Sequence, residues 1–496
     1  MTSPAPTRSF ADRAPYLVAM VLIVVLVGWY TQYIGVGMIA HFDEFYTFER
    51  SVSFARMEDW WAVYSRNEPT LKKPPLQYWM IAGLMELGVS DVVALRAPSL
   101  LFAGLTLGAT ALLARLVLPQ YPWATASAVL IVASSQAFWN HATSAMLDQG
   151  AAFFVTLGLV AMLLAFERPK LWPLFAFVVF LGGLQKGPVA LGFLLFAVLS
   201  LAVTARLQDI PLRTRVNNRW FWISAFVALV LAFSWQLLQD LRFAQDDAIS
   251  GSVEKEMINR FVPGVGDEAT RSWTTISSLI LGKEPIPRLI GFLGLLVIPF
   301  TLKRPLLLGL SGIAVIFVLV MWMASGNVYG RYMLLLTPLL AVGTAGLFAT
   351  VLRKDYLGAL AAIALSVAIG GPFIPQSQLG LQTATRNGAT FQEVLTPVGA
   401  ARRDEETFIV CAWDRPMRIP PGAYTVYAAG TQRYIRLREN DLLDALDDWG
   451  YVVGPLRGVC SPTEMETLSP MLSDLFTETL PGGYLHWTAS GLKTES

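Results

Sequence analysis

Six short stretches of the sequence place charged residues beside long apolar runs, where charge is costly. They read HFDEFYTFER, LKKPPLQYW, SAMLDQG, LQKGPVAL, EKEMINRF and GNVYGRYMLLLTP. The cations in these stretches suit a phosphate or pyrophosphate, and the acids could take the proton of a hydroxyl nucleophile. The residues are the acids Asp43, Glu44, Asp148 and Glu256, the cations Lys72, Lys73, Lys186, Arg260 and Arg331, and Tyr332.

Each of these residues also has an ordinary structural explanation. Asp43 and Glu44 could be a solvated loop, and the lysine pair could bind lipid headgroups. Asp148 could cap a helix N-terminus. Two of the other three cations, Lys186 and Arg331, could snorkel from span ends. No single stretch is specific, so the argument depends on whether all six lie on one side of a membrane.

The composition predicts a membrane protein. Of 496 residues, 54% are hydrophobic and 15% are charged, whereas about 25% are charged in a typical soluble domain. The 15 Trp and 15 Tyr residues suit the two interfaces of a bilayer. With a net charge of +1 and no basic block, nothing in the sequence indicates a nucleic-acid partner.

Apolar windows long enough to cross about 30 Å of hydrocarbon recur about eleven times. They lie at approximately 15–40, 92–114, 122–140, 146–166, 171–185, 187–205, 219–239, 285–302, 305–324, 330–352 and 356–375. The first is too long for a signal peptide and lacks a small-residue cleavage site, so it is interpreted as an anchor. We therefore predict an α-helical polytopic membrane protein.

The positive-inside rule orients these spans. With the N-terminus cytoplasmic, the cytoplasmic turns contain Arg115, Arg168, Lys170, Arg206, Arg213, Arg215, Arg219, Lys303, Arg304, Arg353 and Lys354. The short turns on the other side contain only Lys186 and Arg331. All six charged stretches then fall on the outer side of the membrane.

The same topology places three longer segments outside, at 41–91, 240–284 and about 376–496. The first contains LQYWMIAGLMELG, which is apolar but only 13 residues long and is predicted to lie in the interface. We predict a transmembrane domain over 1–375 and a small extracytoplasmic α/β domain over 376–496. Cys411 and Cys460 both lie in that second domain, where they could pair or remain free thiols.

The order DE, KPP-x-x-YW, RAPS-x-L, MLD, KGP, RF and RYxLxxxP resembles the polytopic GT-C glycosyltransferases. More narrowly, it resembles the bacterial branch that includes the lipid A aminoarabinose transferase and relatives of the protein O-mannosyltransferases. The resemblance runs over about residues 40 to 340. It implies that Asp43 is the catalytic acid, assisted by Glu44. The implied donor-phosphate ligands are Lys73, Lys186, Arg260, Arg331 and Tyr332, supported by Lys72, Asp148 and Glu256.

The resemblance also implies the reaction. A sugar would move, with inversion, from a polyprenyl phosphate to a lipid, glycan or protein acceptor at the outer face of a bacterial cytoplasmic membrane. The aminoarabinose transferases hold a structural zinc with an acid and a histidine, at positions where this chain has Lys72 and Met257. Neither side chain suits zinc. We therefore expect no metal and no other cofactor.

Two other classes of function remain open from the sequence. A transporter or flippase of lipid-linked sugars would also need many spans and basic residues, but its charges usually lie near the bilayer midplane. A non-catalytic membrane scaffold would use the C-terminal domain to bind a partner. The concentration of acids and cations on one face favours the enzyme.

Overall fold

The computed structural model describes residues 10–35, 42–65, 68–71, 73–207, 218–243, 277, 280–282, 284–303, 307–323, 330–369, 407–411, 434–437 and 455–493. The chain divides into two compact units. The first, called here the helical unit, comprises Met1–Tyr33, Pro69–Met80 and Arg96–Ile374. The second comprises Ile34–Glu68, Ile81–Leu95 and Pro375–Ser496.

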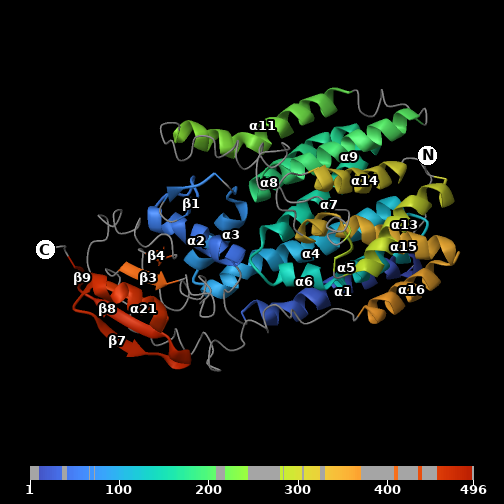
Figure 1. The fold of residues 1–496 in the computed structure, drawn as a ribbon. Helices are drawn as coiled ribbons and strands as arrows, with labels where there is room; N and C mark the ends of the chain where they lie inside the picture. The colour runs from blue at the N-terminus through green and yellow to red at the C-terminus, as the bar shows by residue number, and fades with distance from the viewer. Residues whose placement is uncertain are drawn as a thin grey trace. The chain divides into compact units, whose positions relative to one another are not determined.

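Long helices make up most of the helical unit (Figure 1). They are α1 (Phe10–Ile34), α4 (Asp91–Val117), α5 (Trp123–Ala133), α6 (Gln136–Ala142), α7 (Leu147–Glu167), α8 (Trp172–Lys186), α9 (Pro188–Leu207), α11 (Arg219–Arg242), α13 (Pro285–Thr301), α14 (Leu307–Met323), α15 (Thr337–Val351) and α16 (Asp355–Ala368). Two short 3-10 helices, η1 (Pro169–Leu171) and η3 (Gly330–Leu335), lie between them.

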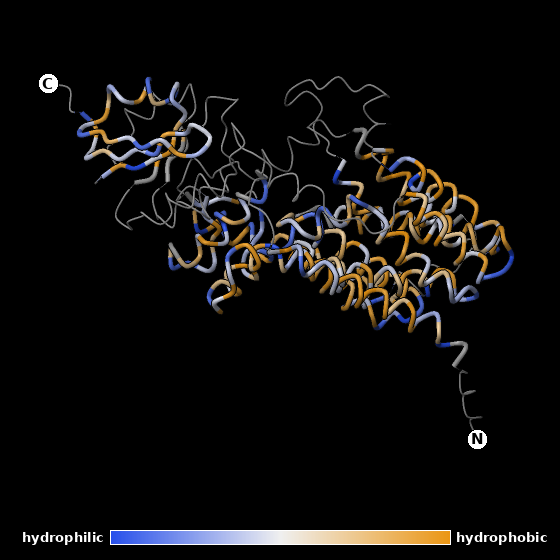
Figure 2. The backbone as a smooth tube through the Cα atoms, turned by 90° about the horizontal axis from the view of Figure 1, so that it is seen from below, coloured by the Kyte–Doolittle hydropathy of each residue, from blue (hydrophilic) through white to orange (hydrophobic). Residues whose placement is uncertain are grey.

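Most residues of these helices are hydrophobic (Figure 2). Among the described residues, four helices are long and apolar enough to cross a membrane, and six further apolar helices are shorter, with lengths of 10–17 residues. Val24, Trp222 and Phe226 are 67%, 60% and 68% exposed, which is a poor surface for water but a suitable one for lipid. Each predicted window contains a described helix, although the number of eleven spans remains a prediction.

Two predicted spans are not continuous helices. The window 122–140 is divided into α5 and α6, because Ser135 leaves the helical conformation and its hydroxyl accepts a hydrogen bond from the Phe138 amide as the N-cap of α6. The window 330–352 is divided into η3 and α15, which has Pro338 in its first turn. The prediction of unbroken helices was wrong at both places.

Small residues allow close helix packing in the helical unit. Gly294 of α13 and Gly343 of α15 pack backbone against backbone, so a side chain at either position would clash. Similarly, a Cβ at Gly183 of α8 would lie 2.9 Å from the carbonyl oxygen of Ala232 in α11. Close packing of this kind is typical of helices in lipid, where van der Waals contact replaces the hydrophobic effect between helices.

The first predicted outer segment contains short elements. They are α2 (Phe42–Met57), β1 (Tyr64–Ser65), β2 (Glu68–Pro69) and α3 (Leu76–Glu86). Strands β1 and β2 form a two-stranded sheet. Helix α3 has 11 residues, which is too short to cross a bilayer and agrees with the predicted interfacial helix.

The C-terminal segment contains a mixed sheet with the strand order β4-β3-β5-β8-β7. Its elements are β3 (Thr407–Cys411), β4 (Tyr434–Leu437), β5 (Leu456–Cys460), α21 (Pro462–Leu468), η7 (Ser469–Met471), β6 (Leu472–Ser473), β7 (Phe476–Thr479), η8 (Pro481–Gly483), β8 (Leu485–Ala489) and β9 (Gly491–Leu492). Strands β4, β3 and β5 are parallel, and β8 pairs antiparallel with β5 and β7. In the same segment, the alternating stretch AYTVYAA predicts a strand and the acidic stretch ENDLLDALDDW predicts a helix, and both stretches lie outside the described residues.

The core of this sheet contains the two cysteines. Cys411 and Cys460 end neighbouring parallel strands, have Cα atoms 4.9 Å apart and form a disulfide. The indole Nε1 of the buried Trp487 donates to Cys460 Sγ at 3.0 Å. Met465 and Leu468 of α21 pack into the same cluster. The question that the sequence left open is therefore answered in favour of a disulfide.

The histidine of strand β8 should make this domain sensitive to acid. Burial and the nearby Arg457 lower the pKa of His486, while Glu478 on the adjacent strand opposes the shift. As the pH falls below about 6.5, the unfolded chain takes up the proton more readily than the folded one, so the free energy of unfolding should decrease. The protection factors of the amides in residues 484–490 of the full-length protein, which correct hydrogen exchange for its intrinsic rate at each pH, should decrease below that pH. His486→Gln should abolish this pH dependence, and an unchanged pH profile in that variant would contradict the assignment.

Candidate functional site

The site is centred on a buried ion pair between two helix ends. Lys186 Nζ lies 2.5 Å from Asp148 Oδ1, and the two side chains are only 10% and 7% exposed. The N-cap of α7 is Met146, so Asp148 is not the cap residue, and Lys186 does not snorkel away from the protein. Neither ordinary explanation therefore describes these two residues.

Local sequence explains why the two charges lie at helix ends. Helix α8 ends at Lys186 because Gly187 has a φ of 68°, which other residues rarely adopt. Pro188 then begins α9, where its missing amide proton costs nothing. Asp148 lies in the first turn of α7 and Lys186 in the last turn of α8. Each charge therefore has the sign that its helix end favours.

Helix η3 adds an aromatic ring and a second cation. Lys186 Nζ lies 5.2 Å from the ring centroid of Tyr332, within the range of a cation–π interaction. The guanidinium of Arg331 lies 5.9 Å from the same centroid. Both cations interact electrostatically with the Asp148 carboxylate, as does His141. Two cationic side chains therefore lie close to one another here, and such side chains are the groups that bind phosphate.

The Lys73 segment runs beside this cluster. Pro74 Cγ lies 3.8 Å from the position that a Cβ on Gly187 would occupy. Lys73 itself is partly buried and makes contacts of its own. The structure thus brings together four predicted site residues, Asp148, Lys186, Arg331 and Tyr332, and places the chain next to Lys73 alongside them.

The two acids of the first stretch begin a helix instead of occupying a loop. Asp43 and Glu44 lie in the first turn of α2, where negative charge is favoured. Glu44 is 2% exposed and Asp43 is partly buried, with its carbonyl accepting from the Thr47 hydroxyl at 2.9 Å. The solvated-loop explanation is therefore wrong for Glu44.

Several predicted residues cannot be placed. Lys72, Glu256 and Arg260 lie outside the described residues, as does Met257. Their roles stay predictions, and so does the expected independence from metal.

Comparison with solved structures identifies the fold. ArnT from Cupriavidus metallidurans bound to undecaprenyl phosphate is 14% identical, with a TM-score of 0.70 over 96% of this chain and 98% of that one. The chain has the GT-C fold. The apo form of ArnT superposes on this chain with a TM-score of 0.69 at 13% identity, over the same shares of the two chains. The archaeal oligosaccharyltransferase AglB from Archaeoglobus fulgidus, in complex with an inhibitory peptide and a dolichol-phosphate, has a TM-score of 0.57 at 13% identity. That likeness covers 97% of this chain and 75% of AglB.

The match to a protein family covers a shorter part of this GT-C chain than the structural matches do. Residues 72–236 match the family described as dolichyl-phosphate-mannose-protein mannosyltransferase. No curated protein matches the sequence. The likeness to membrane proteins and the apolar helix surfaces make the chain an integral membrane protein.

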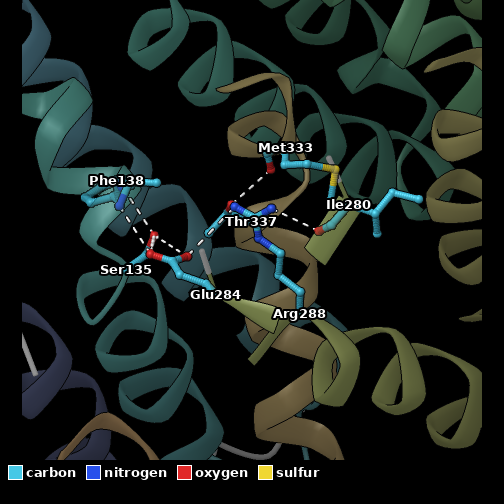
Figure 3. Close-up of polar contacts among 8 residues, drawn as sticks. Ser135, Phe138, Ile280, Glu284, Arg288, Met333 and Thr337 are labelled. Atoms are coloured by element: carbon cyan, nitrogen blue, oxygen red, sulfur yellow. Dashed lines mark hydrogen bonds and ion pairs between the residues drawn. The ribbon is translucent and has the colours of Figure 1, made fainter. Parts of the chain in front are cut away.

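Glu284, which the sequence analysis did not identify, links the start of α13 to the break between α5 and α6 by hydrogen bonds (Figure 3). The Glu284 carboxylate accepts from the Ser135 hydroxyl at 2.9 and 3.0 Å and from the Ala137 amide at 3.2 Å. Arg288 Nη1 donates to the Ile280 carbonyl at 2.9 Å. The adjoining cavity, with a volume of about 30 Å³, has room for only about two water molecules. We therefore assign this contact to the packing of the GT-C helices.

Two glutamines next to the ion pair were also missed. Gln185 precedes Lys186, Gln77 lies four residues after Lys73, and the amide of the first donates to that of the second at 2.6 Å. Glutamine is usually a surface residue, and only the fold reveals that these two are buried side by side. The short spacing between each glutamine and a predicted phosphate ligand was the available signal.

Proposed function

We propose that this chain is a membrane glycosyltransferase that uses a polyprenyl-phosphate sugar as donor. The observation that carries the proposal is the buried cluster of Lys186, Asp148, Arg331 and Tyr332, with the Lys73 segment beside it, in a GT-C fold. The two cations of this cluster suit a lipid-linked phosphate. ArnT, which shares the fold, is bound to undecaprenyl phosphate, and the matching family is described by its dolichyl-phosphate donor.

The donor loses its sugar as the bond between the anomeric carbon and a phosphate oxygen breaks. The leaving group is a phosphate monoester, which departs without a proton but gains negative charge. That charge is stabilised by the cationic side chains of Lys186, Arg331, Lys73 and Arg260. Cations stabilise such charge most when they need no reorientation during the reaction. Asp148 keeps the Lys186 ammonium fixed through their 2.5 Å contact.

The acceptor contributes the new bond. Its hydroxyl oxygen attacks the anomeric carbon from the side opposite the phosphate, and Asp43 takes the hydroxyl proton as general base. A single displacement inverts the anomeric carbon and needs no covalent sugar–enzyme intermediate. Glu44 orients its neighbours, and a phosphate acceptor would react without the base. No metal or other cofactor takes part in this scheme.

We place the reaction at the outer face of a bacterial cytoplasmic membrane, with the N-terminus in the cytoplasm and the C-terminal domain outside. The distribution of Lys and Arg among the turns supports this orientation. The disulfide between Cys411 and Cys460 supports it as well, because disulfides persist in oxidising compartments. The acceptor is then a lipid A-type glycolipid, another envelope glycan or a protein.

Comparing the cell envelope with and without this protein tests the proposal. Membranes with the protein should contain one sugar-modified lipid, glycan or protein that is absent from the deletion strain, and the unaltered gene should restore it. If the deletion strain keeps every envelope sugar, the proposed transferase activity is contradicted. It is contradicted as well if the deletion only causes an intact lipid-linked sugar to accumulate on the cytoplasmic side.

A further inference from the structure

A chain of buried hydrogen bonds links the segments that hold the donor-site residues. Gln185 Nε2 donates to Gln77 Oε1 at 2.6 Å and to the Leu147 carbonyl at 3.2 Å. Gln77 Nε2 donates to Ser99 Oγ at 3.0 Å, and Ser99 Oγ donates to the Met146 carbonyl at 3.4 Å. The three side chains are fully buried. Gln77, Gln185 and Ser99 are called the amide relay below.

Each end of the amide relay is next to a predicted donor ligand. Gln185 is joined by one peptide bond to Lys186, and its bond to Leu147 reaches the residue before Asp148. Gln77 follows Lys73 through Pro74 and Pro75, whose rings fix two backbone angles and so make the connection stiff. The Trp79 amide donates to the Pro75 carbonyl at 2.8 Å and holds the turn into α3. A shift of the relay would therefore shift Lys73 relative to Lys186.

The relay is packed so that the Gln185 amide has one position. Gly150 of α7 lies directly against it, and a Cβ there would lie 2.9 Å from Gln185 Cγ and closer still to the amide atoms. Glycine is thus the residue that lets α7 approach the amide. At the adjoining Gly187, a Cβ would be in ordinary van der Waals contact with Pro74 Cγ, at 3.8 Å.

The polar groups around the relay are not arranged for maximal stability. Among the described residues, Gln185 Oε1 has no hydrogen-bond partner, and neither amide atom of the fully buried Gln149 has one. An unsatisfied buried polar group costs about 1–3 kcal/mol, whereas replacing both partners of a bond by apolar groups of the same shape can be neutral. Stability alone therefore does not account for two amides at this place.

We infer that Gln77 and Gln185 are positioning residues that set the separation between Lys73 and the Lys186–Asp148 pair, and thereby the fit of the site to a lipid-linked phosphate. This inference rests on the proposed function. Neither glutamine touches the phosphate; each acts through the lysine beside it. A misplacement of about 1 Å can cost a site a hundredfold in rate, so a stiff connection between two phosphate ligands has a large effect.

The test replaces both amides by a side chain of the same length without hydrogen-bonding groups, Gln77→Met/Gln185→Met. Affinity for undecaprenyl phosphate, measured on the full-length protein in nanodiscs, should fall about tenfold or more, as a charged hydrogen bond to phosphate is weakened. The midpoint of thermal unfolding should stay unchanged or rise. Each single Met variant should lower the midpoint, because it leaves the partner amide unpaired.

The matched control is Ser200→Ala, which removes a buried hydrogen bond of 2.8 Å from Ser200 to the Gly309 carbonyl, between α9 and α14. It should leave the affinity for undecaprenyl phosphate unchanged. If the unaltered protein binds undecaprenyl phosphate and the double Met variant binds it with the same affinity, this inference is wrong but the proposed function is not affected. A failure of the unaltered protein to bind undecaprenyl phosphate would overturn the proposed function and this inference together.

Discussion

Asp43→Asn should stop sugar transfer while the protein stays folded and still binds undecaprenyl phosphate. Asparagine keeps the shape of the side chain in the first turn of α2 but cannot accept the proton of the acceptor hydroxyl. Loss of general base catalysis typically costs about 10²–10⁴-fold in rate. The measurement is single-turnover transfer with saturating donor, together with the lipid affinity of the same preparation.

The neighbouring acid provides the matched control. Glu44→Gln changes a side chain that is 2% exposed, so it should lower stability more than Asp43→Asn does and slow transfer less. Near-normal transfer by the Asn variant would exclude Asp43 as the base. If the Gln variant is the slower enzyme while still folded, Glu44 is the base instead.

Lys186→Met should cause the second large loss, in both folding and donor binding. The substitution leaves the Asp148 carboxylate buried without its partner at 2.5 Å, and breaking a buried ion pair costs about 3–5 kcal/mol. It also removes one cation from the phosphate site, which is worth about tenfold to a hundredfold in affinity.

A second variant separates the two effects. Lys186→Met/Asp148→Asn removes both charges of the ion pair, so the thermal midpoint should recover most of the loss, but undecaprenyl phosphate affinity should remain low. Lys170→Ala, which removes an exposed lysine in η1, serves as the control and should change neither quantity. Recovery of normal affinity by the double variant would mean that Lys186 is a structural cation and not a phosphate ligand.

The sequence was most informative about features that depend on the membrane, which constrains the whole chain. Long apolar windows predicted the helices, and the Gly187–Pro188 pair predicted the break that ends α8 at Lys186. The gathering of charged residues on one face anticipated the approach of Asp148, Lys186, Arg331 and Tyr332. These features follow from chain-wide constraints, because a membrane sorts residues by depth and side before any helix packs.

The sequence was least informative where tertiary contacts decide. In the sequence, Ser134 and Ser135 look like ordinary residues of an apolar helix. In the structure, Ser135 is the N-cap of α6, and its hydroxyl donates a hydrogen bond to Glu284, which lies 149 residues further along the chain. Gln77 and Gln185 are 108 residues apart, and the short spacing of each from a predicted phosphate ligand does not by itself predict a bond between them. Periodicity reports which face of an element is apolar, but not which buried polar groups meet.

The central claim is that this protein breaks a sugar–phosphate bond on a lipid carrier. The direct measurement incubates the purified full-length protein with undecaprenyl phosphate sugars and an envelope extract and follows the lipid phosphate. We predict that one donor yields free undecaprenyl phosphate and transfers its sugar to a hydroxyl or phosphate with inversion, and that Asp43→Asn does not transfer it to a hydroxyl. Donor that stays intact in every incubation, while still binding the protein or crossing the bilayer, would contradict the account.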